Sequence, residues 1–280
     1  MFFYFKLICF LAFIVVFTSC DSRKLQERKA DRCLETIEEL IDQKAYNQAK
    51  IEIDSLHAQF PLLVAKRRIA AALADTIVRR ESARSLAYCY GILPGKIRQM
   101  DSIQKNFRFE KNIKYQNIGN FIYKSQQTES NANRTYLKTY VDENADFYLI
   151  SNYCGAKIVH GSVEVSANDL FAHTDTIQST DPDYHSFDDS GFHFEAVTFK
   201  NQADKGVVAF IAQSDAKLIK VTLSGKKKFS YFLAEGDRKA IVETYHLWKV
   251  KKDVVQLQRE IKTATFRIGK INYTKNKFKS

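Results

Sequence analysis

The spacing of apolar residues predicts helices over the first third of the chain. From Ala30 to about Arg108, apolar side chains recur every three or four positions, which is the period of an amphipathic helix. The pattern is interrupted near Lys44, at Pro61 and between Gly91 and Gly95. It therefore predicts four helices, over residues 30–43, 46–59, 62–89 and 96–108.

After residue 111 the pattern changes to alternation of apolar and polar positions, which predicts β-strands. Two aromatic and β-branched runs flank Asp142–Asp146 and predict a β-hairpin. Further strand-like runs cover residues 157–165, 191–200, 207–212, 217–223 and 228–233. Gly225 is expected to turn the chain between the last two. Since no helix is predicted between most of these runs, the pattern favours an antiparallel sheet or small sandwich over a doubly wound fold.

The C-terminal segment carries a heptad-like apolar stripe, in which the intervals alternate between three and four residues. The stripe consists of Leu247, Val250, Val254, Leu257, Ile261, Ala264 and Ile268. It could pair with a partner chain or pack back onto the N-terminal helices. We favour the second interpretation, because those helices present apolar stripes with no fully apolar partner among themselves. The predicted fold class is therefore α+β, with N-terminal helical hairpins forming a bundle, an antiparallel β domain in the middle and a long C-terminal helix packing back on the bundle.

The first twenty residues have the form of an export signal. Lys6 precedes an uncharged apolar run over residues 7–17, and Thr18-Ser19-Cys20 follows. A spanning helix needs about 20 apolar residues, a length reached only if the residues before Lys6 are included. Residues 17–20 resemble the lipobox of bacterial lipoproteins, which implies that Cys20 is acylated and becomes the new N-terminus. The alternative is an uncleaved signal anchor, and both place the remaining chain outside the cytoplasm.

These patterns divide the chain into six segments. They are a signal peptide (1–19), a lipidated tether (20–29), a helical region (30–110), an antiparallel β domain (111–233), a long coiled-coil-like C-terminal helix (234–270) and a basic tail (271–280). Within the helical region, residues 45–61 resemble the second helix of a tetratricopeptide repeat, with Tyr46, Ala49, Ile53 and Pro61 at that family's offsets. One unit does not make a solenoid, and the resemblance implies no binding residues.

The formal net charge of +11 raises the question of a polyanionic partner. The basic excess lies in residues 21–110 and 235–280, whereas residues 111–234 are close to neutral. Because an exported protein rarely meets nucleic acid, we expect no nucleic-acid partner. The expected counter-charges are anionic lipid headgroups, envelope polymers or another envelope protein. Outside the signal and Cys20, three widely spaced cysteines do not form a disulfide framework, and most are expected to be small buried side chains.

The sequence contains few residue patterns that indicate catalysis or metal binding. Residues 171–195 gather His173, His185 and His193 among acidic residues, but without a metal-ligand spacing. No nucleophile elbow or phosphate-binding loop is present in the sequence. We therefore expect no catalytic residue, metal or cofactor. Cys154 and His160 could be drawn as a thiol and base, but a core cysteine and an edge histidine are the expected roles. The alternative is an envelope hydrolase or metal-dependent enzyme using the His/Asp cluster of residues 173–195.

Four tripeptides consist of Asp, a hydroxyl residue and an aliphatic residue. They resemble the O-glycosylation acceptors of exported Bacteroidetes proteins, which implies sugars on Ser55, Thr76, Ser102 and Thr176. Together with the lipobox, the chain resembles the uncharacterised lipoproteins of that group, and no activity comes with the resemblance. The expected function is that of a non-catalytic binding or scaffolding lipoprotein of the cell envelope. We expect it to be anchored to a membrane and to face the periplasm or the cell surface. Of the two membranes, we favour the outer one.

Overall fold

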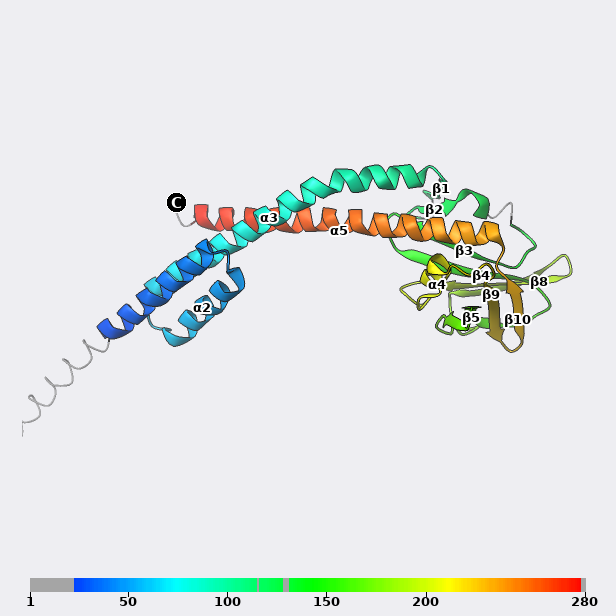
Figure 1. The fold of residues 1–280 in the computed structure, drawn as a ribbon, viewed down its shortest axis with the longest axis horizontal. Coiled ribbons are helices and arrows are strands. Elements are labelled where there is room, and N and C mark those ends of the chain that lie inside the picture. The colour runs from blue at the N-terminus through cyan, green and yellow to red at the C-terminus, as the bar shows by residue number, and fades with distance from the viewer. Residues whose placement is uncertain (1–22, 115, 128–130, 278–280) are drawn as a thin grey trace, which may run out of the picture. The chain divides into compact units, whose positions relative to one another are not determined.

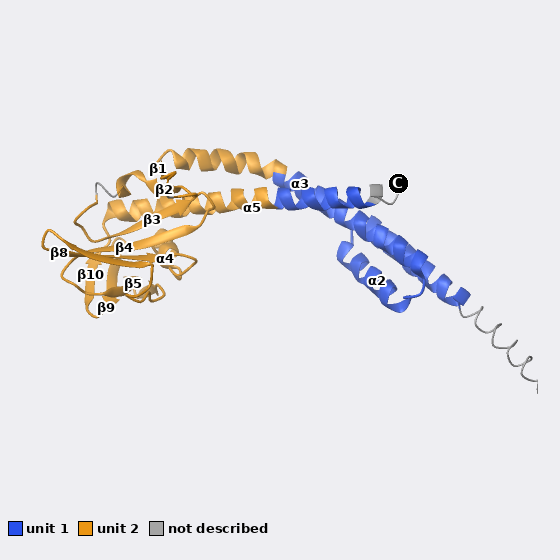
Figure 2. Cartoon of the chain, turned by 180° about the vertical axis from the view of Figure 1, so that it is seen from behind, with its two compact units in different colours: residues 1–89, 260–280 blue, residues 90–259 orange. Residues whose placement is uncertain are grey.

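The computed structural model describes residues 23–114, 116–127 and 131–277, and its fold class is the predicted α+β. Helices come first, two antiparallel sheets follow, and the C-terminal helix α5 (Glu235–Lys277) packs on α3 (Val64–Gln104) (Figure 1). The chain divides into two compact units. The first contains the described residues up to Cys89 together with those from Glu260 onward, and the second spans Tyr90–Arg259, so that α3 and α5 run through both (Figure 2).

The helices of the first unit have a core of their own. A helix over residues 23–42, α2 (Tyr46–Gln59) and the start of α3 bury a shared apolar cluster, to which Leu34, Ile53 and Ile77 belong. The predicted helix at 46–59 is therefore confirmed, and the one predicted at 30–43 ends within one residue of its prediction but begins at residue 23. Residues 23–29, expected as a tether, are helical. The cluster contains no residue of α5, so the expectation that these helices lack an apolar partner among themselves is wrong.

The predicted break between residues 89 and 96 is wrong, because α3 continues through it with Pro94 inside the helix. Proline removes one helical hydrogen bond at this point. Contacts with α5 flank the site: Ser85 donates to Glu260 (Oγ–Oε1 2.8 Å) within the first unit, and Lys96 pairs with Asp253 (Nζ–Oδ2 2.6 Å) within the second. The apolar stripe of α5 is buried at Leu247, Val250, Val254 and Ala264, and packing of α5 within the chain is confirmed.

The larger sheet has six antiparallel strands in the order β1-β2-β3-β4-β8-β7. Their bounds are β1 Phe107–Glu110, β2 Asn120–Tyr123, β3 Tyr136–Asp142, β4 Phe147–Gly155, β7 Tyr184–Asp189 and β8 Phe192–Phe199. The predicted hairpin is confirmed as β3 and β4, in which Val141 opposes Phe147. β1 lies in a stretch predicted as helix. Beyond the end of β2, the side chain of Gln126, in the short helix η1 (Lys124–Gln126), hydrogen-bonds the backbone of β3 in place of a neighbouring strand.

The smaller sheet has four antiparallel strands in the order β10-β9-β5-β6. Their bounds are β5 His160–Ala167, β6 Leu170–His173, β9 Lys220–Gly225 and β10 Lys228–Phe232. Gly225 lies at the β9–β10 turn, as predicted, but the structure gives a further reason for glycine there. A Cβ on Gly225 would lie 1.9 Å from the carbonyl oxygen of Val159, so the close approach of β5 excludes any side chain.

Residues 207–212, predicted as a strand, form the helix α4 (Val207–Gln213), so that prediction is wrong. A short apolar run fits a buried strand and a buried helix equally well, because its length carries no clear period. The side chains of α4 join the main core between the two sheets, together with Leu149 and Val197 of the larger sheet, Leu223 of the smaller and Ile241 of α5. Among the described residues, no helix combines the length and apolar character that crossing a membrane requires.

Candidate functional site

The residues that the sequence singles out for modification lie apart from one another. Cys20 and the signal lie outside the described residues. Ser55 is on α2, Thr76 and Ser102 are on α3, and Thr176 lies between β6 and β7, all at exposed or half-exposed positions. Their glycosylation stays a prediction. The three remaining cysteines are free, with Cys89 buried and Cys33 and Cys154 half-exposed.

The structure does not bring the three histidines of the predicted cluster together. His173 lies on β6 of the smaller sheet, whereas His185 and His193 lie on neighbouring strands of the larger one. His193 is paired with Asp188 (Nδ1–Oδ1 2.7 Å), and the alternation of β-strands places His185 on the opposite face. Within residues 23–277, as far as they are described, no three His, Cys, Asp or Glu side chains are grouped to hold a metal ion.

A different histidine lies in a buried polar network that joins the two sheets. His160 of β5 contacts Ser151 of β4 (Nε2–Oγ 3.0 Å) and Glu195 of β8 (Nδ1–Oε2 2.7 Å). Glu195 also accepts hydrogen bonds from the backbone N–H groups of residues 158, 159 and 160, at 2.7–2.9 Å. Ser151 and His160 are fully buried and Glu195 is 2% exposed. The carboxylate is thus held entirely by protein donors.

The electrostatics of this network favour a permanently charged Glu195. Burial alone raises the pKa of a carboxyl group, but the hydrogen bonds from the His160 ring and from the three backbone N–H groups lower the pKa of Glu195 to about 2. The same hydrogen bonds hold Val159 at φ 52°, an unusual conformation for a β-branched residue. The network therefore fixes an irregular strand start in β5.

The order of Ser151, His160 and Glu195 is that of a serine nucleophile, a base and an orienting acid. A nucleophile must also reach the carbonyl that it attacks, and Ser151 has no exposed surface. Ser151 lies opposite Leu137 of β3 and Val197 of β8, two residues of the main core. In this conformation the network joins two sheets and cannot carry out acyl transfer.

The expectation of an edge histidine at position 160 is wrong, for a local reason. Val163 and Val165 face the core, so strict alternation would place His160 on the opposite face of β5. The pairing of β5 with β9 shifts register between His160 and Ser162, and this irregularity turns the ring inward. Glu195 did carry a sequence signal, because it alternates in phase with the buried Val197 and Phe199.

The larger sheet packs one side against the main core. We call the opposite side, which carries partly exposed side chains, the outer face. Opposed residues of an antiparallel pair point to the same side, so the strand registers define this face. It contains Tyr136, Lys138, Tyr140, Tyr148, Ile150, Asn152, Cys154, His185, Phe187, Asp189, Phe192, Phe194, Ala196 and Thr198, of which Tyr136 is buried. Most of these side chains are half-exposed, none belongs to the main core, and Phe187 is 58% exposed.

Aromatic rings are paired on the outer face. Tyr140 and Tyr148 stack with ring centroids 4.5 Å apart, and Phe187 and Phe194 stack at 4.9 Å. Partial burial raises the pKa of Tyr140, so its hydroxyl stays neutral at physiological pH. The face therefore offers a broad aromatic and aliphatic surface with few formal charges, positioned by rigid strands.

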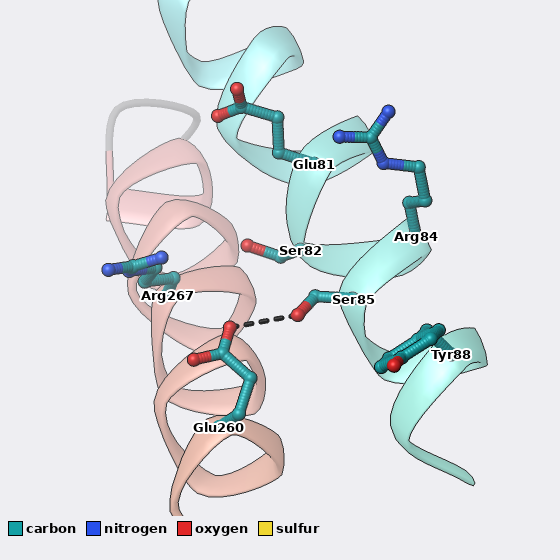
Figure 3. Close-up of a pocket in the computed structure, with 7 residues that line it drawn as sticks. All are labelled: Glu81, Ser82, Arg84, Ser85, Tyr88, Glu260 and Arg267. Carbon is teal, nitrogen blue, oxygen red and sulfur yellow. Dashed lines mark hydrogen bonds between the residues drawn. The ribbon is translucent and has the colours of Figure 1, made fainter. Parts of the chain in front are cut away.

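A pocket of about 430 Å³ lies between α3 and α5 in the first unit (Figure 3). Ser82 and Ser85 line it from α3, and Glu260 accepts the hydrogen bond of Ser85. The guanidinium groups of Arg84 and Arg267 point away from the space between the helices (Figure 3). The pocket thus lacks convergent charged groups and results from small serine side chains at the helix contact.

No family model matches the chain, and no curated protein or solved structure is significantly similar to it. The candidate sites therefore rest on the geometry described above.

Proposed function

We propose that this chain is a lipoprotein of the cell envelope that binds another envelope protein through the outer face, without catalysis. The observation that carries the proposal is the set of stacked aromatic rings on that face, of which Phe187 is exposed and Tyr140, Tyr148 and Phe194 are half-exposed. Contiguous exposed apolar surface on a soluble domain marks an interaction site. Aromatic residues with few charges are also the composition found at the centre of protein interfaces.

The dimensions of the outer face favour a protein over a small ligand. The side chains assigned to the outer face lie on four neighbouring strands, β3, β4, β8 and β7, which at a spacing of about 4.8 Å span about 14 Å across the sheet. Small-ligand sites are concave pockets, whereas the face of a sheet has no enclosing walls and suits contact with another protein surface. The strands hold the rings in place before binding, so little conformational entropy is lost on association.

The alternative, an envelope hydrolase or metal-dependent enzyme, has less support. His173, His185 and His193 are dispersed over two sheets and two faces. The array formed by Ser151, His160 and Glu195 has a fully buried serine. We therefore place the function at the surface and not in the core.

The proposed anchor is an acylated Cys20, which would hold the protein at a membrane, facing the periplasm or the cell surface. Each buried methylene of an acyl chain contributes about 0.8 kcal/mol to membrane binding. We expect that Cys20→Ala abolishes incorporation of radiolabelled fatty acid, whereas Cys33→Ala leaves it unchanged. Undiminished labelling of the Cys20 variant would show that the anchor lies elsewhere.

The binding role is tested by placing a photo-crosslinking amino acid at position 187 in living cells. We expect a discrete crosslinked species there, because the Phe187 side chain lies on the outer face and is 58% exposed. The control position is Lys252, an exposed residue on α5. Ile150→Asp, which adds a charge to the same face, is expected to reduce crosslinking at position 187 at least fivefold.

Two results would contradict the proposal. One is the absence of a specific product at position 187 under conditions where the protein is abundant. The other is a product that forms equally at positions 187 and 252 and that persists in the Ile150→Asp variant.

A further inference from the structure

One side of the smaller sheet faces solvent, and we call it the polar face. Unlike the outer face of the larger sheet, it carries mainly polar side chains. The strand registers arrange its side chains in three rows. The first row consists of Phe171, Ser166, Lys220 and Phe232. The second row consists of His173, Glu164, Thr222 and Ser230. The third row consists of Ser162, Ser224 and Lys228.

Two aromatic rings stand at the two ends of the first row. Phe171 is 65% exposed and Phe232 is 62% exposed, and β5 and β9 lie between them. Three strand spacings place the two residues about 14 Å apart across the sheet. Ser166 and Lys220 fill the interval between the rings. The row therefore presents two apolar contacts separated by a polar centre.

Hydroxyl groups occupy much of the remaining polar face. Five of its residues are Ser or Thr, at positions 162, 166, 222, 224 and 230. Thr222 and Ser230 share a hydrogen bond (Oγ1–Oγ 3.0 Å), and each oxygen keeps capacity for a further partner. The flat backbone of the sheet holds these groups at regular spacing.

The charge on and around this face is positive. Lys217, Lys220, Lys226, Lys227 and Lys228 lie on β9, β10 and their flanks, where Asp215 is the one acidic residue between positions 214 and 233. In the described part of the chain, none of these five lysines forms an ion pair. Glu164 is the single carboxylate among the three rows. Exposed ammonium groups without carboxylate partners leave the face complementary to an anion.

We propose that the polar face binds an acidic polysaccharide. The C–H faces of sugar rings pack against exposed aromatic rings, which carry negative charge on their faces. Sugar hydroxyls exchange hydrogen bonds with Ser and Thr hydroxyls. The carboxylates of the polymer pair with the free lysines. A face that extends over three rows and four strands is larger than one sugar ring and accommodates a chain of several.

Other partners fit these side chains less well. A protein interface needs a contiguous apolar centre, whereas here the apolar side chains stand at the ends of one row. A lipid surface would bury hydroxyls and Glu164 in the middle of the face, at a cost in desolvation. The inference goes beyond the proposed function, because it concerns a different sheet and a polymer instead of a protein.

The test measures binding of polygalacturonate and alginate, two acidic polysaccharides, to the full chain purified in detergent, by microscale thermophoresis. We expect affinity for both polymers at least tenfold above that for neutral dextran, falling as salt rises. Phe171→Ala and Phe232→Ala should each weaken binding at least threefold, and Lys220→Glu at least tenfold. Matched controls are Phe187→Ala on the outer face and Lys252→Glu on α5, which should leave affinity unchanged. Circular dichroism confirms that each variant is folded.

Three outcomes would overturn the proposal. The first is no binding of either acidic polymer, or equal binding of dextran. The second is polymer binding that the Phe171, Phe232 and Lys220 variants leave intact. The third is a loss, in the same variants, of binding to phosphatidylglycerol vesicles but not to the polymers, which would assign the face to lipid. Since every variant keeps Cys20 and the rest of the chain, differences between them report on the substituted residues of the polar face.

Discussion

Glu195 is the residue whose chemistry most constrains the β domain. Its carboxylate accepts hydrogen bonds from the His160 ring and from three successive backbone N–H groups, inside a site that water does not reach. A buried charge that loses its partners is strongly destabilising, and so are buried donors that lose their acceptor. The position therefore bears on the stability of the β domain.

We predict that Glu195→Gln lowers the free energy of unfolding at pH 7 by about 3 kcal/mol. Because the folded pKa of Glu195 is about 2 and its ordinary value is 4.5, the carboxylate stabilises the fold fully above pH 4.5. That contribution is lost as pH falls from 4.5 toward 2. The difference between wild type and variant should therefore narrow between pH 5 and pH 3, as measured by urea denaturation.

Glu164→Gln is the matched control, because Glu164 is an exposed carboxylate on β5. It should change the free energy of unfolding by no more than about 0.5 kcal/mol. A Glu195→Gln variant as stable as wild type, or a difference that stays constant from pH 7 to pH 3, would contradict the role assigned to the network.

Single residues also show what the sequence could predict about the candidate sites. Glu195 could have been assigned to the core, since it alternates in phase with Val197. His160 could not, because the register shift that turns it inward depends on pairing with β9, about sixty residues away in sequence. The outer face could not be predicted from the sequence either, because its residues are defined by strand order and register, which no local pattern contains.

Among the elements, α3 differs most from its prediction. Gly91, Pro94 and Gly95 are typical of a helix break, yet the helix continues through all three. Tertiary packing outweighs local propensity here, since α5 contacts α3 on both sides of the segment through Ser85 and Lys96. The heptad-like stripe of α5 was predictable because its repeat persists over three heptads, whereas the seven residues of α4 carry no decisive period.

The continuity of α3 gives a second prediction. A Cβ at Gly91 or Gly95 would meet nothing within 4 Å, so neither alanine creates a clash. If both residues are helical, Gly91→Ala and Gly95→Ala should each raise the free energy of unfolding by about 1 kcal/mol, which urea denaturation measures.

Gly225→Ala provides the contrasting control, since its Cβ would lie 1.9 Å from the Val159 carbonyl oxygen. This variant should lose about 2 kcal/mol or more. Unchanged or reduced stability in both Gly91→Ala and Gly95→Ala would favour a broken helix at this point.

At the scale of the whole molecule, two long helices run through both compact units, while the surfaces proposed for binding lie entirely in the second unit. The predicted α+β plan was recoverable because each segment has its own hydrophobic period. The location of a binding surface could not be predicted from the sequence, because it depends on which side of the larger sheet is covered by the smaller sheet and α5. We propose a protein partner for the outer face and a polymer for the polar face.

The chain's own thiols can report whether a partner covers the outer face in the envelope, as we propose. Cys154 lies half-exposed on the outer face, and Cys33 lies half-exposed on the helix over residues 23–42. The measurement is the rate of alkylation of each cysteine by N-ethylmaleimide, followed by mass spectrometry, in intact envelopes and in detergent-purified protein. We predict that Cys154 reacts at least tenfold more slowly in envelopes, while Cys33 reacts at similar rates in both. Equal rates for Cys154 in the two preparations would contradict the account.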